Sequence, residues 1–127
     1  MEEKNSIKSF RDLIVYQKSY TAMISVAEKV LPLLPEAEKY DLRDQLSRSS
    51  KAVPRLIAEG YSKRHQKSGF QKYLDDALAE CNETIVSLEQ SKDLYMKENL
   101  DCHRLIEEYD IISRQIYMLA KKWKNFC

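Results

Sequence analysis

Glycine and proline are scarce in this sequence, with two glycines and three prolines among 127 residues. Because a β-sheet protein needs turn residues at frequent intervals, this scarcity excludes a turn-rich all-β fold and favours long helices. The longest apolar run is far short of the ~20 residues that a membrane helix needs, and residues 1–10 lack the apolar core of a secretory signal. We therefore expect an all-α cytoplasmic protein without a membrane partner.

Cysteine is also scarce, and its spacing predicts neither a disulfide framework nor a zinc site: the residues are Cys81, Cys102 and Cys127. Neither His65 nor His103 has an acidic residue three positions before it, as a di-iron helix bundle requires. Cys81 lies on an apolar stripe, which predicts a small core residue and not a nucleophile. With no glycine-rich phosphate loop either, the sequence predicts a protein that is not an enzyme and uses no metal or cofactor.

Apolar residues recur at steps of three and four through most of the chain, which is the spacing of one helix face. These steps predict four helices, over about residues 10–31, 37–61, 68–97 and 100–125. The fourth is the most regular, from Leu105 to Phe126. Four such helices with short links predict a single domain over residues 1–127, an elongated antiparallel up-down-up-down four-helix bundle.

Three local signals refine these helices. Ser9 followed by Asp12 predicts a variant capping box that opens the first helix. The second helix starts at some point between Pro35 and Asp41, and both ends of that interval remain open. Gly60 predicts a left-handed terminus for the same helix.

Charge is unevenly distributed, although the net charge of the chain is only +1. Between Arg43 and Lys72, eight basic residues stand against two acidic ones, whereas Tyr73 to Ser91 contains five acidic residues and no basic one. In one interpretation the second and third helices compensate each other through surface ion pairs, each worth ~0–1 kcal/mol. In the other, the basic residues bind the phosphates of RNA or DNA. A third interpretation is a head-to-tail ring, in which a basic face meets an acidic face of the next subunit.

The candidates for contact with nucleic acid are Arg43, Arg48, Lys51, Arg55, Lys63, Arg64 and Lys67. Tyr61, His65 and Phe70 are interleaved with the last of these. Aromatic rings at such positions either stack on unpaired bases or belong to the core at the end of the bundle.

The chain resembles a family of small bacterial four-helix bundles, the 23S ribosomal RNA intervening-sequence proteins. This family includes the accessory variability determinant of diversity-generating retroelements. The resemblance is carried by FRDLIVYQKSY, LPEAEKYDLRDQLSRSSKAVPRLIAEGYSKR and FQKYLDDALAECNETI. Its motif or interface positions are Gln45, Pro54, Glu59, Gly60 and Glu83. The chain departs from the pattern at Leu56, where the family usually has Asn, and at Ala79-Glu80, where it usually has Gly-Ser.

The resemblance implies a closed homopentamer that acts as a scaffold for nucleic acid and, in retroelements, for a reverse transcriptase. Together with the charge distribution, it predicts a non-enzymatic, oligomeric nucleic-acid-binding scaffold. The alternative is a structural or adaptor protein whose basic and acidic faces serve self-assembly or the binding of a protein partner.

Overall fold

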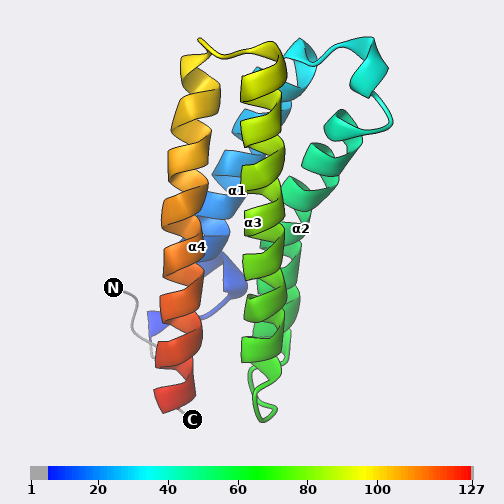
Figure 1. Cartoon of the computed structure of the whole chain (residues 1–127). Coiled ribbons are helices and arrows are strands. Elements are labelled where there is room, and N and C mark those ends of the chain that lie inside the picture. Colours follow the sequence, from blue (N-terminus) through cyan, green and yellow to red (C-terminus); the bar gives the residue numbers. More distant parts are fainter. Residues whose placement is uncertain (1–5, 127) are drawn as a thin grey trace.

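A computed structural model describes residues 6–126 of the chain, with side chains described as far as Trp123. Its long helices are α1 (Ile14–Ser25), α2 (Leu42–Ser62), α3 (Gly69–Tyr95) and α4 (Leu100–Phe126). Each runs antiparallel to the next one along the chain, and no strand is found among the described residues (Figure 1). The predicted all-α four-helix bundle is confirmed.

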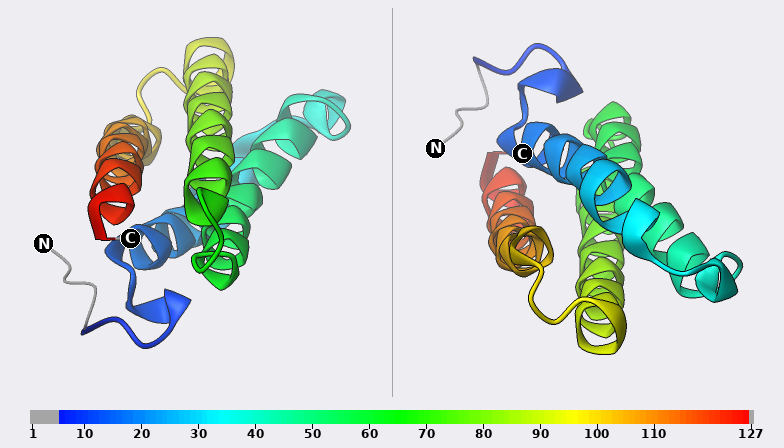
Figure 2. Two further views of the ribbon diagram at one scale, coloured as in Figure 1. Left: turned by 90° about the horizontal axis from the view of Figure 1, so that it is seen from below. Right: turned by 90° about the horizontal axis from the view of Figure 1, so that it is seen from above.

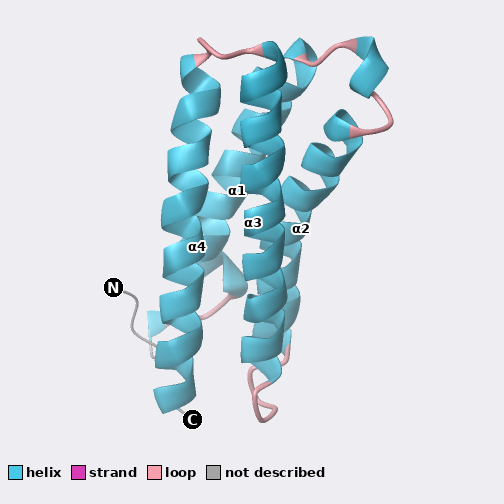
Figure 3. Cartoon of the chain, in the orientation of Figure 1, coloured by secondary structure: helices cyan, strands magenta, loops and turns pink. Residues whose placement is uncertain are grey.

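The bundle is elongated, because α3 and α4 each have 27 residues and a helix of that length spans about 40 Å. Viewed along its axis, α3 lies between α2 and α4, and α1 closes the circuit (Figure 2). The connecting loops are short and lie at the two ends of the bundle (Figure 3). No helix in the part of the chain that is described has a stretch long and apolar enough to cross a membrane.

The predicted capping box at Ser9 is present, but it does not open α1. The Ser9 backbone N–H donates to the Asp12 carboxylate at 3.1 Å, and the box begins a 3-10 turn over Phe10–Asp12. Leu13 then adopts an extended backbone, with ψ of 127°. The α-helix therefore starts at Ile14, four residues later than the predicted start near residue 10.

Between α1 and α2 the chain passes through short turns. A π-helical segment, Val26–Val30, continues α1 and leads into a 3-10 turn at Leu31–Leu33. Pro35 precedes a second 3-10 turn and does not open α2. The later of the two predicted starts is therefore correct: α2 begins at Leu42, whose N–H donates to the Glu38 carboxylate at 3.2 Å.

The predicted left-handed terminus at Gly60 is wrong. Gly60 lies inside α2, and neither it nor Gly69 has a positive φ. A Cβ atom on Gly60 would lie 2.5 Å from the Cβ atom of Tyr73 on α3. The residue is needed for the close approach of α2 to α3, and the left-handed residue in the turn that follows is Ser68, with φ of 56°.

The core follows the predicted inward faces of α2, α3 and α4, and Pro54 is buried within a continuous α2. The inward face expected for α1, which steps from Leu13 through Tyr16 and Tyr20, is wrong: Tyr20 is 45% exposed, and α1 buries Val15, Ser19 and Ala22 instead. At one end of the bundle, Trp123 of α4 packs edge-to-face against Phe70 of α3, with ring centroids 4.9 Å apart, and against Tyr61 of α2 at 6.1 Å. The predicted core position Phe126 lies outside the described side chains, as does Cys127.

Candidate nucleic-acid interface

A polar groove of ≈ 420 Å³ lies between α2 and α3. It is lined by Gln45, Arg48, Ser49, Lys51, Ala52, Arg55, Glu80 and Glu83. The hydroxyls of Ser49 and Thr84 are in buried hydrogen-bond contact at 2.9 Å, which ties the two helices together beneath the groove. The lining therefore combines the basic stripe of α2 with two acidic residues of α3.

The basic side of the groove follows from helix geometry. Arg48, Lys51 and Arg55 are separated by three and four residues, so they project from one face of α2. All three are exposed, and they lie on the side of the helix opposite the fully buried Leu46 and Val53. The structure thus brings together three of the seven predicted contact residues.

The remaining four predicted contacts occupy two other places. Arg43 is half-buried and lies about 140° around α2 from Arg48, so it does not line the groove. Lys63, Arg64 and Lys67 are exposed at the end of the bundle, in the turn between α2 and α3. The Arg64 guanidinium donates to the backbone carbonyl of Tyr61 at 2.9 Å and lies over its ring at 4.1 Å.

The acidic side of the groove places two carboxylates close to one another and to Arg48. Partial burial raises the pKa of Glu80, the neighbouring Glu83 raises this pKa further, and the Arg48 guanidinium lowers it. Arg48 itself forms an ion pair with Asp44 of its own helix, with Nε and Oδ2 3.1 Å apart. Within residues 6–123 no ion pair joins α2 to α3, so the predicted cross-helix compensation is not made through direct pairs.

The same arrangement corrects the premise of the head-to-tail ring. That interpretation requires the basic and acidic residues to lie on different faces of the bundle. Glu80 and Glu83 instead line the same groove as Arg48, Lys51 and Arg55. For these five residues, the expectation that basic and acidic side chains lie on different faces of the bundle is wrong.

Of the two interpretations of the aromatic residues, base stacking or membership of the core, the structure supports the core for Tyr61 and Phe70. Phe70 is fully buried and Tyr61 is 7% exposed, since both pack against Trp123. Neither ring is available to stack on a base. His65, in the turn between α2 and α3, is exposed.

The sequence profile of the family described as 23S rRNA-intervening sequence protein matches residues 11–118. The chain belongs to this family. No curated protein sequence matches it significantly. The match confirms the family suggested by the sequence motifs, and it ends inside α4, so Lys121 and Trp123 lie beyond the matched residues.

The predicted motif residues of the 23S rRNA-intervening sequence protein family lie in three places: the groove, the core and the exposed surface. Gln45 and Glu83 line the groove, Pro54 and Gly60 are buried, and Glu59 is exposed. Leu56, which stands where the family usually has Asn, packs against the core.

Glu80, at a motif position where the resemblance implies Ser, lines the groove beside Glu83. Its carboxyl group adds a second acidic side chain to the groove. In the sequence, Glu80 could be noticed only as a departure from the expected motif. The packing of α2 on α3 is what shows that its side chain lies in the groove.

The cysteines with described side chains are buried thiols. Burial raises the pKa of Cys81 to about 12, and it also raises the pKa of Cys102, whose thiol donates to the Leu88 carbonyl at 3.4 Å. Such thiols are not nucleophilic at neutral pH, so Cys81 is a core residue, as predicted. Among the residues that the structure describes, no three His, Cys, Asp or Glu side chains are grouped to hold a metal ion.

Proposed function

We propose that this member of the 23S rRNA-intervening sequence protein family is a non-enzymatic cytoplasmic scaffold that binds the phosphate backbone of RNA or DNA. The observation that carries the proposal is the exposed basic stripe of Arg48, Lys51 and Arg55, which is followed along α2 by the basic turn at residues 63–68. This surface has the composition typical of sequence-independent phosphate contacts.

The stripe is available for such contacts at small energetic cost. Its one ion pair with a described residue, between Arg48 and Asp44, is exposed and joins residues one helix turn apart. Pairs of this kind contribute ~0.3–0.5 kcal/mol and exchange readily for a phosphate. Six phosphate contacts to a duplex would make the affinity fall about 10³-fold between 50 and 200 mM salt.

The test is a filter-binding titration with a short RNA duplex at ~50 mM salt. We expect the wild-type protein to bind, and Arg48→Glu with Arg55→Glu to weaken binding by about 100-fold, because two contacts become repulsive. Glu80→Gln with Glu83→Gln is the matched variant of opposite sign, and it should tighten binding several-fold. Absence of wild-type binding at low salt, or an unchanged affinity of the arginine variant, would refute the proposal.

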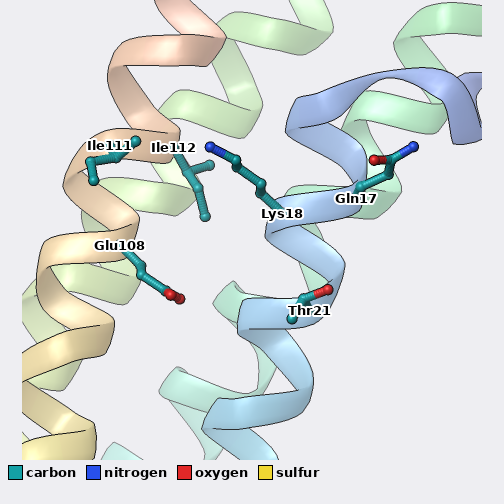
Figure 4. Close-up of a pocket in the computed structure, with 6 residues that line it drawn as sticks. All are labelled: Gln17, Lys18, Thr21, Glu108, Ile111 and Ile112. Carbon is teal, nitrogen blue, oxygen red and sulfur yellow. The ribbon is translucent and has the colours of Figure 1, made fainter.

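We propose self-assembly as a second candidate function, favoured by the side of the bundle between α1 and α4. A largely apolar pocket of ≈ 320 Å³ opens there, lined by Gln17, Lys18, Thr21, Glu108, Ile111 and Ile112. Lys18 extends from α1 towards α4, and Glu108 points into the gap (Figure 4). Ile111 is 43% exposed, and Met118, two turns later on the same face of α4, is 45% exposed. Exposed apolar side chains bordering a pocket are typical of a subunit contact.

Light scattering at micromolar concentration tests this second candidate. We expect a closed homo-oligomer, the pentamer that the family resemblance implies, and we expect Ile111→Asp to dissociate it, because a charged carboxylate would replace an apolar side chain in the buried contact. Val86→Asp is the matched control, since Val86 is similarly exposed on α3, away from this pocket. A monomeric wild type would exclude assembly. Loss of assembly in the Arg48 and Arg55 variant would instead place those arginines at the subunit contact.

A further inference from the structure

Two stretches of the sequence contain basic residues and no acidic ones. Between Gly60 and Leu74 the charged residues are Lys63, Arg64, Lys67 and Lys72. From Ile111 to the last residue they are Arg114, Lys121, Lys122 and Lys124. The two stretches are about 50 residues apart in the chain, so the charge distribution alone does not relate them.

Trp123 brings these stretches to the same end of the bundle. Its ring packs against Tyr61 and Phe70, which flank the turn between α2 and α3. The last turns of α4, in red, therefore lie at the same end as that turn, in green (Figures 1 and 2). At the opposite end, where α3 connects to α4, Lys92 and Lys97 are balanced by Asp93 and Glu98. The unbalanced positive charge of these two stretches is therefore at the first end of the bundle, which we call the basic end.

The cations of the basic end are accessible. Lys63, Lys67, Lys72 and Lys121 are all exposed, and none forms an ion pair with any residue of the described range 6–123. The Lys121 ammonium lies 5.7 Å from the centre of the exposed Tyr117 ring. The rings of Tyr61, Phe70 and Trp123 are buried against one another and offer no platform for stacking, whereas the rings of Tyr117 and His65 are exposed beside the cations.

We propose that the basic end binds the backbone of a nucleic-acid duplex, and that Lys121 of α4 contributes a phosphate contact together with Lys67 of the turn between α2 and α3. The inference rests on the proposed function and names the class of nucleic acid. A duplex presents one phosphate charge per ~1.7 Å of its axis, so it can engage cations from two separate helices at once. Single strands are bound mainly through base stacking, for which the three buried rings are unavailable.

Salt-dependent binding to two RNA probes tests this inference: a hairpin with a stem of ~16 base pairs and an oligouridine of equal length. We expect the hairpin to bind about tenfold more tightly than the single strand. Lys121→Gln should lower the affinity for the hairpin about three- to fivefold and reduce the slope of log K against log salt by ~0.9, the value for one duplex phosphate contact. Lys97→Gln is the matched control, because Lys97 is exposed at the opposite end of the bundle. It should bind like the wild type.

The outcomes separate this inference from the function on which it rests. Suppose that the wild-type protein binds the hairpin and that the variant with both Arg48→Glu and Arg55→Glu binds it more weakly. If Lys121→Gln then binds the hairpin as tightly as Lys97→Gln does, the contact from α4 is refuted and the proposed function stands. Equal or tighter binding of oligouridine refutes the duplex preference. If the wild-type protein binds neither probe at low salt, the proposed function fails first. Circular dichroism checks that the variants are folded.

Discussion

Trp123→Ala is expected to lower the free energy of unfolding by about 3–5 kcal/mol, the range for removing a large buried aromatic side chain. Trp123 is 2% exposed, and it joins the last turns of α4 to α2 and α3 through two edge-to-face ring contacts. Its removal leaves a cavity between Tyr61 and Phe70, and the end of α4 loses its main anchor. Since domains are typically stable by only 5–15 kcal/mol, such a loss approaches the whole stability of a marginal protein.

Urea unfolding followed by circular dichroism measures this effect. Tyr117→Ala is the matched control, because it removes an aromatic side chain from the same helix that is 54% exposed. This control should cost less than ~1 kcal/mol, as most surface substitutions do. Trp123→Phe should retain much of the stability lost in the alanine variant. Similar losses in the Trp123 and Tyr117 alanine variants would contradict the anchoring role of Trp123.

Gly60→Ala is expected to destabilise the protein by about 3 kcal/mol, although alanine is the better helix former by ~1 kcal/mol. The new Cβ atom would lie 2.5 Å from the Tyr73 Cβ atom and 3.0 Å from the Phe70 ring. Because a Cβ atom is bound directly to the backbone, no rotation of the Tyr73 side chain relieves the first clash. The two helices must therefore move apart, and the contacts around the polar groove weaken with them.

A size exchange across this contact separates the clash from helix propensity. Adding Tyr73→Gly to Gly60→Ala removes the clashing Cβ atom. Tyr73→Gly should therefore lower the free energy of unfolding by less in the Gly60→Ala background than in the wild-type protein. Ala79→Gly, at an exposed position of α3, calibrates the propensity difference alone and should cost ~1 kcal/mol. A net gain in stability for Gly60→Ala would show that α2 and α3 do not require this close approach.

Much of the fold was predictable because side-chain direction repeats locally in a helix. The steps of three and four located all four helices, and α3 and α4 end within two residues of the predicted limits. The errors lie where the cause is not local. The apolar spacing of the first helix begins at Leu13, but the extended backbone of that residue delays α1, which then buries Val15, Ser19 and Ala22. Glycine is typical of a helix end, but Gly60 is instead required inside α2, because Tyr73 on α3 leaves no room for a side chain there.

The candidate site was predictable only in part, for the same reason. The stripe of Arg48, Lys51 and Arg55 follows from spacing along one helix. The position of Glu83 beside that stripe depends instead on the register of α3 against α2, which the contact of Ser49 with Thr84 ties at one point. Spacing on a single helix contains no information about that register.

The sequence by itself thus determined the four helices, the inward faces of α2, α3 and α4, the basic character of α2 and the family. Only the tertiary structure decided that Glu80 and Glu83 share the groove of the basic stripe, and that Tyr61 and Phe70 are core residues. It also placed the C-terminal part of α4 beside the turn between α2 and α3. The physical reason is that periodicity records which side of a helix is buried. The neighbours of an exposed side chain depend on how helices distant in the chain pack together.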